Sequence, residues 1–133
     1  MKSTLLLALL FCTAIAVSAQ KDSGEKIRKY YFVLLTSGPN RNQDSVTAAQ
    51  IQKAHLANMG ILYKQGKLKV AGPFGDEGNW QGVFIFDCAT KAETEALLQT
   101  DPAIKAGRLN YEIHEWYTMA KGSFIPGKPK GND

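Results

Sequence analysis

The sequence predicts one α+β domain, in which an antiparallel four-stranded sheet carries two helices on one of its faces. Three observations lead to this fold class. First, segments rich in β-branched and aromatic residues alternate with segments of helical periodicity. Second, these segments follow one another in a β-α-β-β-α-β order, which is the split βαβ or ferredoxin-like arrangement. Third, the chain has 133 residues, which is enough for one hydrophobic core.

The first strand and the first helix are separated by a polar loop. Residues 30–35 form a continuous run of Tyr, Phe, Val and Leu, which predicts a strand buried on both faces. The loop covers residues 37–45, and Thr47 with Gln50 then fits a capping box that would begin the helix. Gly66 marks the end of this helix because glycine readily adopts the left-handed conformation found there.

The second and third strands are predicted to form a hairpin. Residues 67–71 alternate between polar and apolar side chains, and the strand stops at Gly72-Pro73-Phe74. Residues 75–79 have the glycine-rich and acidic composition of a turn. Residues 80–87 then supply the third strand, and its apolar side chains point to both faces of the sheet.

The last part of the domain contains a helix, a short helical turn and a strand. The helix is predicted at residues 91–99, with alanines and leucines on its apolar side. Asp101-Pro102 restarts the chain as a helical turn, since proline suits the first helical position, and Gly107 stops it. Residues 109–117 form the last strand.

Two helices cover only one face of such a sheet, although its strands are apolar on both faces. Leaving two phenylalanine side chains in water would forfeit roughly 3–6 kcal/mol of burial. A homodimer with its sheets packed face to face would cover the second face by using the same surface twice. The alternative is that the terminal segments fold back over this face.

The N-terminus resembles a secretory signal peptide, which we place at residues 1–19. Lys2 is followed by the apolar stretch of residues 4–17, which is shorter than a membrane-spanning helix of about 20 residues. Small residues precede an expected cleavage after Ala19. An uncleaved anchor and lipidation of Cys12 are the alternatives. We therefore expect an exported protein, periplasmic or secreted, with no stable membrane association after cleavage.

The mature chain is expected to contain a flexible lead at residues 20–28, a folded domain at residues 29–120 and a flexible tail at residues 121–133. Its basic residues are scattered rather than arranged as a stripe, which argues against nucleic-acid binding. Cys88 follows a strand, so it is interpreted as a buried structural thiol rather than a catalytic thiolate. The histidines His55 and His114 lie on different elements without metal-ligand spacing, so neither a metal nor a cofactor is expected.

His55 and Asp101 are the candidates for acid–base chemistry. Each has a structural alternative, because His55 lies on the apolar face of its helix and Asp101 has the position of a helix N-cap. The two interpretations are compatible, since a capping carboxylate is fixed and can also accept a hydrogen bond from an imidazole. The second ring nitrogen of His55 would then be free to act as a general base.

The sequence also resembles the YCII-related family. The resemblance rests on His55-Leu56 within a helix, on residues 71–74 (Ala-Gly-Pro-Phe) at a strand end, and on Asp101-Pro102 followed by residues 105–107 (Lys-Ala-Gly). It covers residues 29–118 and implies a dimeric α+β barrel with a His/Asp dyad, which falls on His55 and Asp101. Characterised relatives eliminate halide from chlorinated aromatic intermediates, and the wider superfamily includes isomerases and monooxygenases. These relatives are usually cytoplasmic, so the signal peptide separates this chain from their catabolic role.

The expected function is proton transfer by the dyad on a small organic ligand, as in a lyase or an isomerase. We expect the ligand to be bound by loop and strand-end residues, namely Ser37, Arg41, Gly72, Pro73 and Phe74. A dimer that binds a small ligand without catalysis is the main alternative, and a purely structural dimer is a weaker one.

Overall fold

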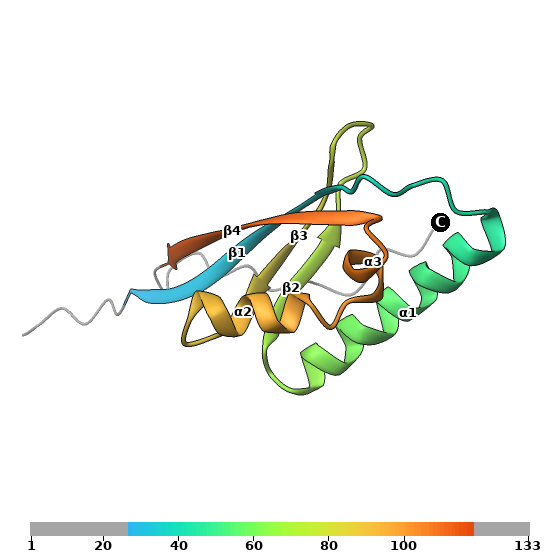
Figure 1. The fold of residues 1–133 in the computed structure, drawn as a ribbon. Helices are drawn as coiled ribbons and strands as arrows, with labels where there is room; N and C mark the ends of the chain where they lie inside the picture. Colours follow the sequence, from blue (N-terminus) through green and yellow to red (C-terminus); the bar gives the residue numbers. More distant parts are fainter. Residues whose placement is uncertain (1–26, 119–133) are drawn as a thin grey trace, which may run out of the picture.

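The structure of the protein is a computed structural model that describes residues 27–118 (Figure 1). The expected signal peptide, most of the lead and the whole tail lie outside these residues. The elements follow the predicted order and confirm the α+β fold class. They are β1 (Arg28–Ser37), α1 (Ser45–Lys64), β2 (Leu68–Pro73), β3 (Trp80–Phe86), α2 (Lys91–Leu98), α3 (Pro102–Lys105) and β4 (Leu109–Thr118).

The four strands form one antiparallel sheet in the order β2-β3-β1-β4. The two central strands are therefore β1 and β3, and β1 pairs with β4 over its whole length, from Arg28 opposite Thr118 to Ser37 opposite Leu109. All three helices lie on the same side of the sheet (Figure 1). Within residues 27–118 the sheet therefore has one covered face and one open face.

The hydrophobic core lies between the covered face and the helices. Tyr31, Val33 and Leu35 of β1 point into it because alternate strand residues share a face. Phe86 of β3 is completely buried beside them. Cys88 is a free thiol at the edge of this core, which confirms its predicted burial, and the same burial raises its pKa.

The beginning of α1 differs from the prediction. The helix is capped by Asp44 rather than by Thr47, since the Asp44 carboxylate accepts hydrogen bonds from the amides of Val46 and Thr47 at 3.0 and 2.9 Å. The Asp44 carboxylate also accepts a hydrogen bond from the Thr47 hydroxyl at 2.7 Å. Thr47, which was predicted to be the cap, therefore donates to the residue that caps the helix. These bonds, the Thr47 hydroxyl first, hold the pKa of Asp44 below its usual value. A carboxylate is also favoured at this position by the helix dipole.

The end of α1 confirms the prediction. Gly66 has φ +73°, and its amide donates to the Tyr63 carbonyl at 2.9 Å. Although α1 has 20 residues, no helix within residues 27–118 combines the length and apolar character needed to span a membrane.

The first strand is much longer than predicted. β1 begins at Arg28, inside the expected lead, and ends at Ser37, where the loop was expected to begin. Pairing with β4 extends β1 in both directions, and the Ser37 amide donates to the Asn79 carbonyl at 2.8 Å. β2 continues through Pro73. Proline is tolerated there because β2 is an edge strand, where a missing N–H need not break a ladder bond.

The open face carries two apolar rows across the sheet. In one row Val70 of β2, Ile85 of β3 and Phe32 of β1 are neighbours. In the next row Val83 lies beside Leu34. These five side chains are half-buried, and no helix of residues 27–118 lies above them (Figure 1).

Candidate functional site

His55 and Asp101 form a direct pair in the structure. The Nδ1 atom of His55 lies 2.6 Å from Oδ2 of Asp101, although the two residues are 46 positions apart in the sequence. His55 is 7% exposed and Asp101 is 1% exposed. A short hydrogen bond in such a dry setting fixes both the position and the orientation of the imidazole ring.

The carboxylate of Asp101 is held from both sides. Its second oxygen, Oδ1, accepts from the Ala103 amide at 2.8 Å, which makes Asp101 the N-cap of α3 as predicted. Pro102 occupies the first helical position and removes an amide that would otherwise need a partner. The cap and the contact with His55 therefore use different oxygens, so one side chain serves both roles.

A second contact joins α1 to the segment that carries Asp101. The Thr100 hydroxyl lies 3.1 Å from Oδ1 of Asn58 and 2.6 Å from the Leu97 carbonyl. Asn58 is three residues beyond His55 on α1, and Thr100 directly precedes Asp101. Each partner of the dyad thus has a neighbour that ties the same two segments together.

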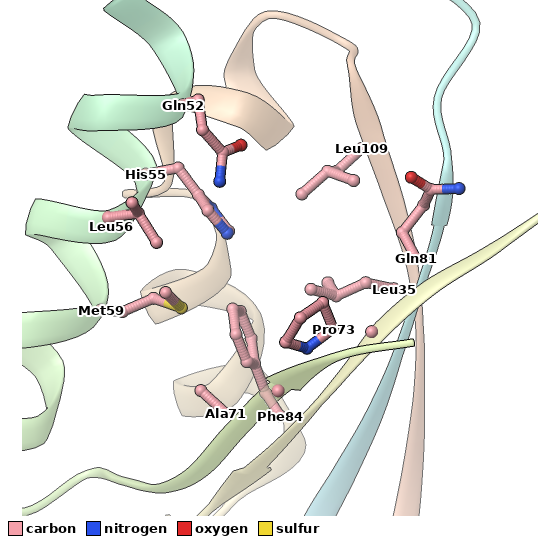
Figure 2. A pocket seen from close by; sticks show the side chains of 12 residues that line it. Leu35, Gln52, His55, Leu56, Met59, Ala71, Pro73, Gln81, Phe84 and Leu109 are labelled. Atoms are coloured by element: carbon pink, nitrogen blue, oxygen red, sulfur yellow. The ribbon is translucent and has the colours of Figure 1, made fainter. Parts of the chain in front are cut away.

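The ring of His55 faces a cavity of about 260 Å³ between α1 and the sheet (Figure 2). Most of its lining is apolar, and the polar side chains are those of Gln52, His55 and Gln81. α1 forms one wall and β2 and β3 form the opposite wall. The remaining lining residues are Leu35, Leu56, Met59, Ala71, Gly72, Pro73, Gly82, Phe84 and Leu109.

The aromatic residue of this lining lies against the dyad. The rings of Phe84 and His55 are stacked, with their centroids 6.0 Å apart and their planes at 23°. Phe84 in turn makes an edge contact with Phe86, at 5.8 Å and 87°. The imidazole is therefore fixed by Asp101 at one nitrogen and by an aromatic ring on one face.

The predicted ligand-binding residues divide into two groups. Gly72 and Pro73 line the cavity on β2. Ser37, Arg41 and Phe74 are outside its lining: Ser37 ends β1, and Phe74 packs against Trp80, with ring centroids 5.9 Å apart. Arg41 reaches the rim indirectly, because its guanidinium donates to the side-chain oxygen of Gln81 at 3.4 Å and to the Arg108 carbonyl at 3.3 Å.

Several lining residues were not predicted from the sequence, among them Gln52, Gln81 and Phe84. Gln52 lies three residues before His55, so helical spacing places it on the same wall and is a signal that was available. Gln81 and Phe84 come from β3, and only the register of the sheet brings them opposite α1.

The chemical capacity of the site is that of one oriented imidazole. When the Nδ1–H group donates a hydrogen bond to Asp101, the neutral imidazole carries its lone pair on Nε2, on the side away from Asp101. Such a nitrogen can accept a proton from a bound molecule and return it. Within residues 27–118 there is no group of three or more His, Cys, Asp or Glu side chains that could hold a metal ion. His114 lies on β4, where its Nε2 atom is 3.5 Å from Oε2 of Glu112.

This chain is similar to a known protein family. The model of the YCII-related domain matches residues 30–117. The chain belongs to the YCII-related family. This confirms the resemblance inferred from the segments around His55, Gly72 and Asp101. No curated protein matches the chain.

Nine chains of solved structures match this protein. One of them is the 5-chloro-2-hydroxyhydroquinone dehydrochlorinase of Burkholderia phenoliruptrix, in complex with 2,5-dihydroxybenzoquinone. Its identity to this chain is 22%, its TM-score is 0.50, and the match covers 65% of this chain and 92% of that one. At this identity the similarity establishes a shared fold.

Proposed function

We propose that this YCII-related protein transfers protons on a small organic molecule by means of the His55–Asp101 dyad, as a lyase or an isomerase. The observation that carries the proposal is the 2.6 Å contact between Nδ1 of His55 and Oδ2 of Asp101, with the imidazole facing a cavity of about 260 Å³. An apolar cavity of about 150 Å³ holds a benzene molecule. The site therefore has room for one ring with substituents.

The proposed chemistry follows from the position of a single base. In an elimination, Nε2 of His55 takes a proton from the ligand. The electron pair of the broken bond to hydrogen then forms a double bond, and the leaving group departs with the electron pair of the bond that held it. In an isomerisation, the same nitrogen returns the proton to another atom of the ligand. Asp101 stabilises the imidazolium that forms in either case. The dehydrochlorinase with the same fold supports the elimination as the first reaction to test.

The decisive experiment measures chloride release from 5-chloro-2-hydroxyhydroquinone. His55→Ala is expected to lower the rate by about 10²–10⁴-fold, which is the usual contribution of a general base. His114→Ala replaces the other histidine, which is exposed on β4, and should leave the rate within about twofold. Equal rates in the wild type and His55→Ala would refute the proposal.

A second variant separates catalysis from folding. Asp101→Asn retains a good N-cap for α3, because asparagine caps helices as well as aspartate does. It replaces the acceptor of the Nδ1 proton by a neutral amide, so the rate should fall while the far-ultraviolet circular dichroism stays unchanged. Stabilisation of the wild type by 2,5-dihydroxybenzoquinone without any product would instead support a non-catalytic binding protein.

We also propose that the protein acts as a homodimer outside the cytoplasm. The apolar rows of the open face, which include Phe32, Leu34 and Ile85, support the packing of one sheet against that of a second copy. The apolar stretch of residues 4–17 supports export. Mass spectrometry of the protein recovered from an expressing bacterium tests export, since cleavage after Ala19 leaves Gln20 at the N-terminus.

A further inference from the structure

Gln52 is one of the three polar side chains in the cavity lining, together with His55 and Gln81. It lies on α1 three residues before His55, and Figure 2 shows its amide on the same wall as the imidazole, directed toward the cavity. Among the residues that the structure describes, its amide has no hydrogen-bond partner. An exposed glutamine is ordinary on a helix, but this one borders a cavity beside an oriented base.

The other glutamine of the lining already makes two hydrogen bonds with the protein. The side-chain oxygen of Gln81 accepts from Arg41 at 3.4 Å, and its nitrogen donates to the Gly78 carbonyl at 3.0 Å. Within residues 27–118, Gln52 is therefore the one glutamine of the lining whose amide makes no hydrogen bond, and Nε2 of His55 beside it also makes none. A glutamine amide offers both an acceptor oxygen and two N–H donors.

From this we infer that Gln52 determines ligand specificity by binding a second oxygen substituent, on the same edge of the ring as the oxygen that meets His55. Residues three apart on a helix have Cβ atoms about 5–6 Å from each other. Two oxygens in a 1,3 relation on a six-membered ring can meet both side chains, whereas the oxygens of a 1,4 pair point in opposite directions. Leu35, Pro73 and Phe84 supply apolar contacts for the rest of the ring.

This inference rests on the proposed function, because it takes the cavity beside His55 as the ligand site. It adds the residue that orients the ligand and the substitution pattern that this residue recognises. Gln52 is a positioning residue here, since the proton moves only to and from His55.

The test compares three probes, namely resorcinol, hydroquinone and phenol, in nuclear magnetic resonance titrations of the full mature chain. The imidazole signals of His55 and the side-chain NH₂ signal of Gln52 report on the two contacts separately. In the wild type, resorcinol should bind about three- to tenfold more tightly than phenol or hydroquinone, which is the range of one net hydrogen bond. Resorcinol alone should shift the Gln52 signal.

The variant Gln52→Leu should reduce the affinity for resorcinol to that for phenol and leave the affinity for phenol unchanged. Leucine is a good helix former at this exposed position, so α1 should remain folded. Gln50→Leu is the matched control, because Gln50 is an exposed glutamine of the same helix outside the cavity lining, and it should retain the preference for resorcinol.

Two outcomes overturn the inference in distinguishable ways. If all three probes shift His55 with equal affinity, or if Gln52→Leu behaves like Gln50→Leu, the role of Gln52 is refuted and proton transfer by His55 stands. If no probe shifts the His55 signals, the cavity is not the ligand site, and the proposed function fails together with the inference.

Discussion

The covered and open faces of the sheet are built from similar side chains but have different surroundings. Leu34 and Leu35 are adjacent in β1 and point to opposite faces. Leu35 is 4% exposed beneath the helices, whereas Leu34 is half-buried on the open face. In β3, Phe86 is completely buried, whereas its neighbour Ile85 is half-buried.

The difference shows which part of the apolar pattern forms the core of residues 27–118 and which part these residues leave without a covering layer. The covered face forms the core and also supplies Leu35 and Phe84 to the lining of the cavity beside His55. The open face has no such role within residues 27–118. An apolar surface of this kind is typical of a protein–protein contact. The following four predictions test this contrast, beginning with the largest expected effect.

Leu35→Ala should lower the free energy of unfolding by about 2–5 kcal/mol, because the change leaves a cavity in the core. Leu34→Ala removes the same atoms one residue earlier and should cost less under dilute conditions that favour the monomer. Urea denaturation of both variants at submicromolar concentration measures the difference. A loss for Leu34→Ala that equals that for Leu35→Ala would contradict the contrast between the faces.

Ile85→Glu should dissociate the proposed dimer while the monomer remains folded. In a two-fold interface the substitution places two carboxylates in an apolar contact, so the dissociation constant should rise by at least about a hundredfold. Analytical ultracentrifugation at micromolar concentration measures it, with circular dichroism as the test of folding. A wild-type chain that sediments as a monomer at these concentrations would refute the dimer itself.

Thr90→Ala should destabilise the helix layer by about 1 kcal/mol. Thr90 is the N-cap of α2, and its hydroxyl accepts from the Glu93 amide at 3.1 Å. Thr90→Ser retains the hydroxyl and is expected to stay close to the wild type in thermal unfolding. If Thr90→Ser loses as much stability as Thr90→Ala, the cap is not the source of the effect.

The smallest effect concerns the ion pair between Lys67, which precedes β2, and Glu93 of α2. The hydrogen bond that Glu93 accepts from Lys67 is the main cause that lowers the pKa of Glu93 below its ordinary value of 4.5. A hydrogen bond from the Ala89 amide lowers this pKa further. The bond between Lys67 and Glu93 also raises the pKa of Lys67 above 10.5. The contribution of Glu93 is therefore complete above pH 4.5 and is lost as the pH falls through its lowered pKa, whereas that of Lys67 is lost only as the pH rises through its raised pKa.

Denaturation of wild type and Glu93→Gln at several pH values tests this sign. The stability difference between them should shrink as the pH is lowered from 6 toward 3, since the wild-type carboxylate is then protonated. A difference that grows over this range would show that the pair does not stabilise the folded state.

Much of the fold and part of the site could be predicted from the sequence. The β-α-β-β-α-β order, the glycine that ends α1, the cap at Asp101 and the burial of Cys88 all depend on local signals. The cap of α1 was predicted wrongly, because Thr47 and Gln50 have the spacing of a capping box while Asp44 has the stronger acceptor. The end of β2 at residues 72–74 was predicted correctly, but both ends of β1 were missed because pairing with β4, rather than composition, extends that strand.

The candidates for acid–base chemistry could be named from residue types and spacing alone, because the helical position of His55 and the Asp101-Pro102 pair are local features. Two facts required the folded chain: Nδ1 of His55 lies 2.6 Å from Oδ2 of Asp101, and within residues 27–118 the amide of Gln81 is hydrogen-bonded whereas that of Gln52 is not. The reason is that both facts depend on the packing of α1 against α3 and on the register of β3. Such long-range contacts leave no periodic signal in the chain.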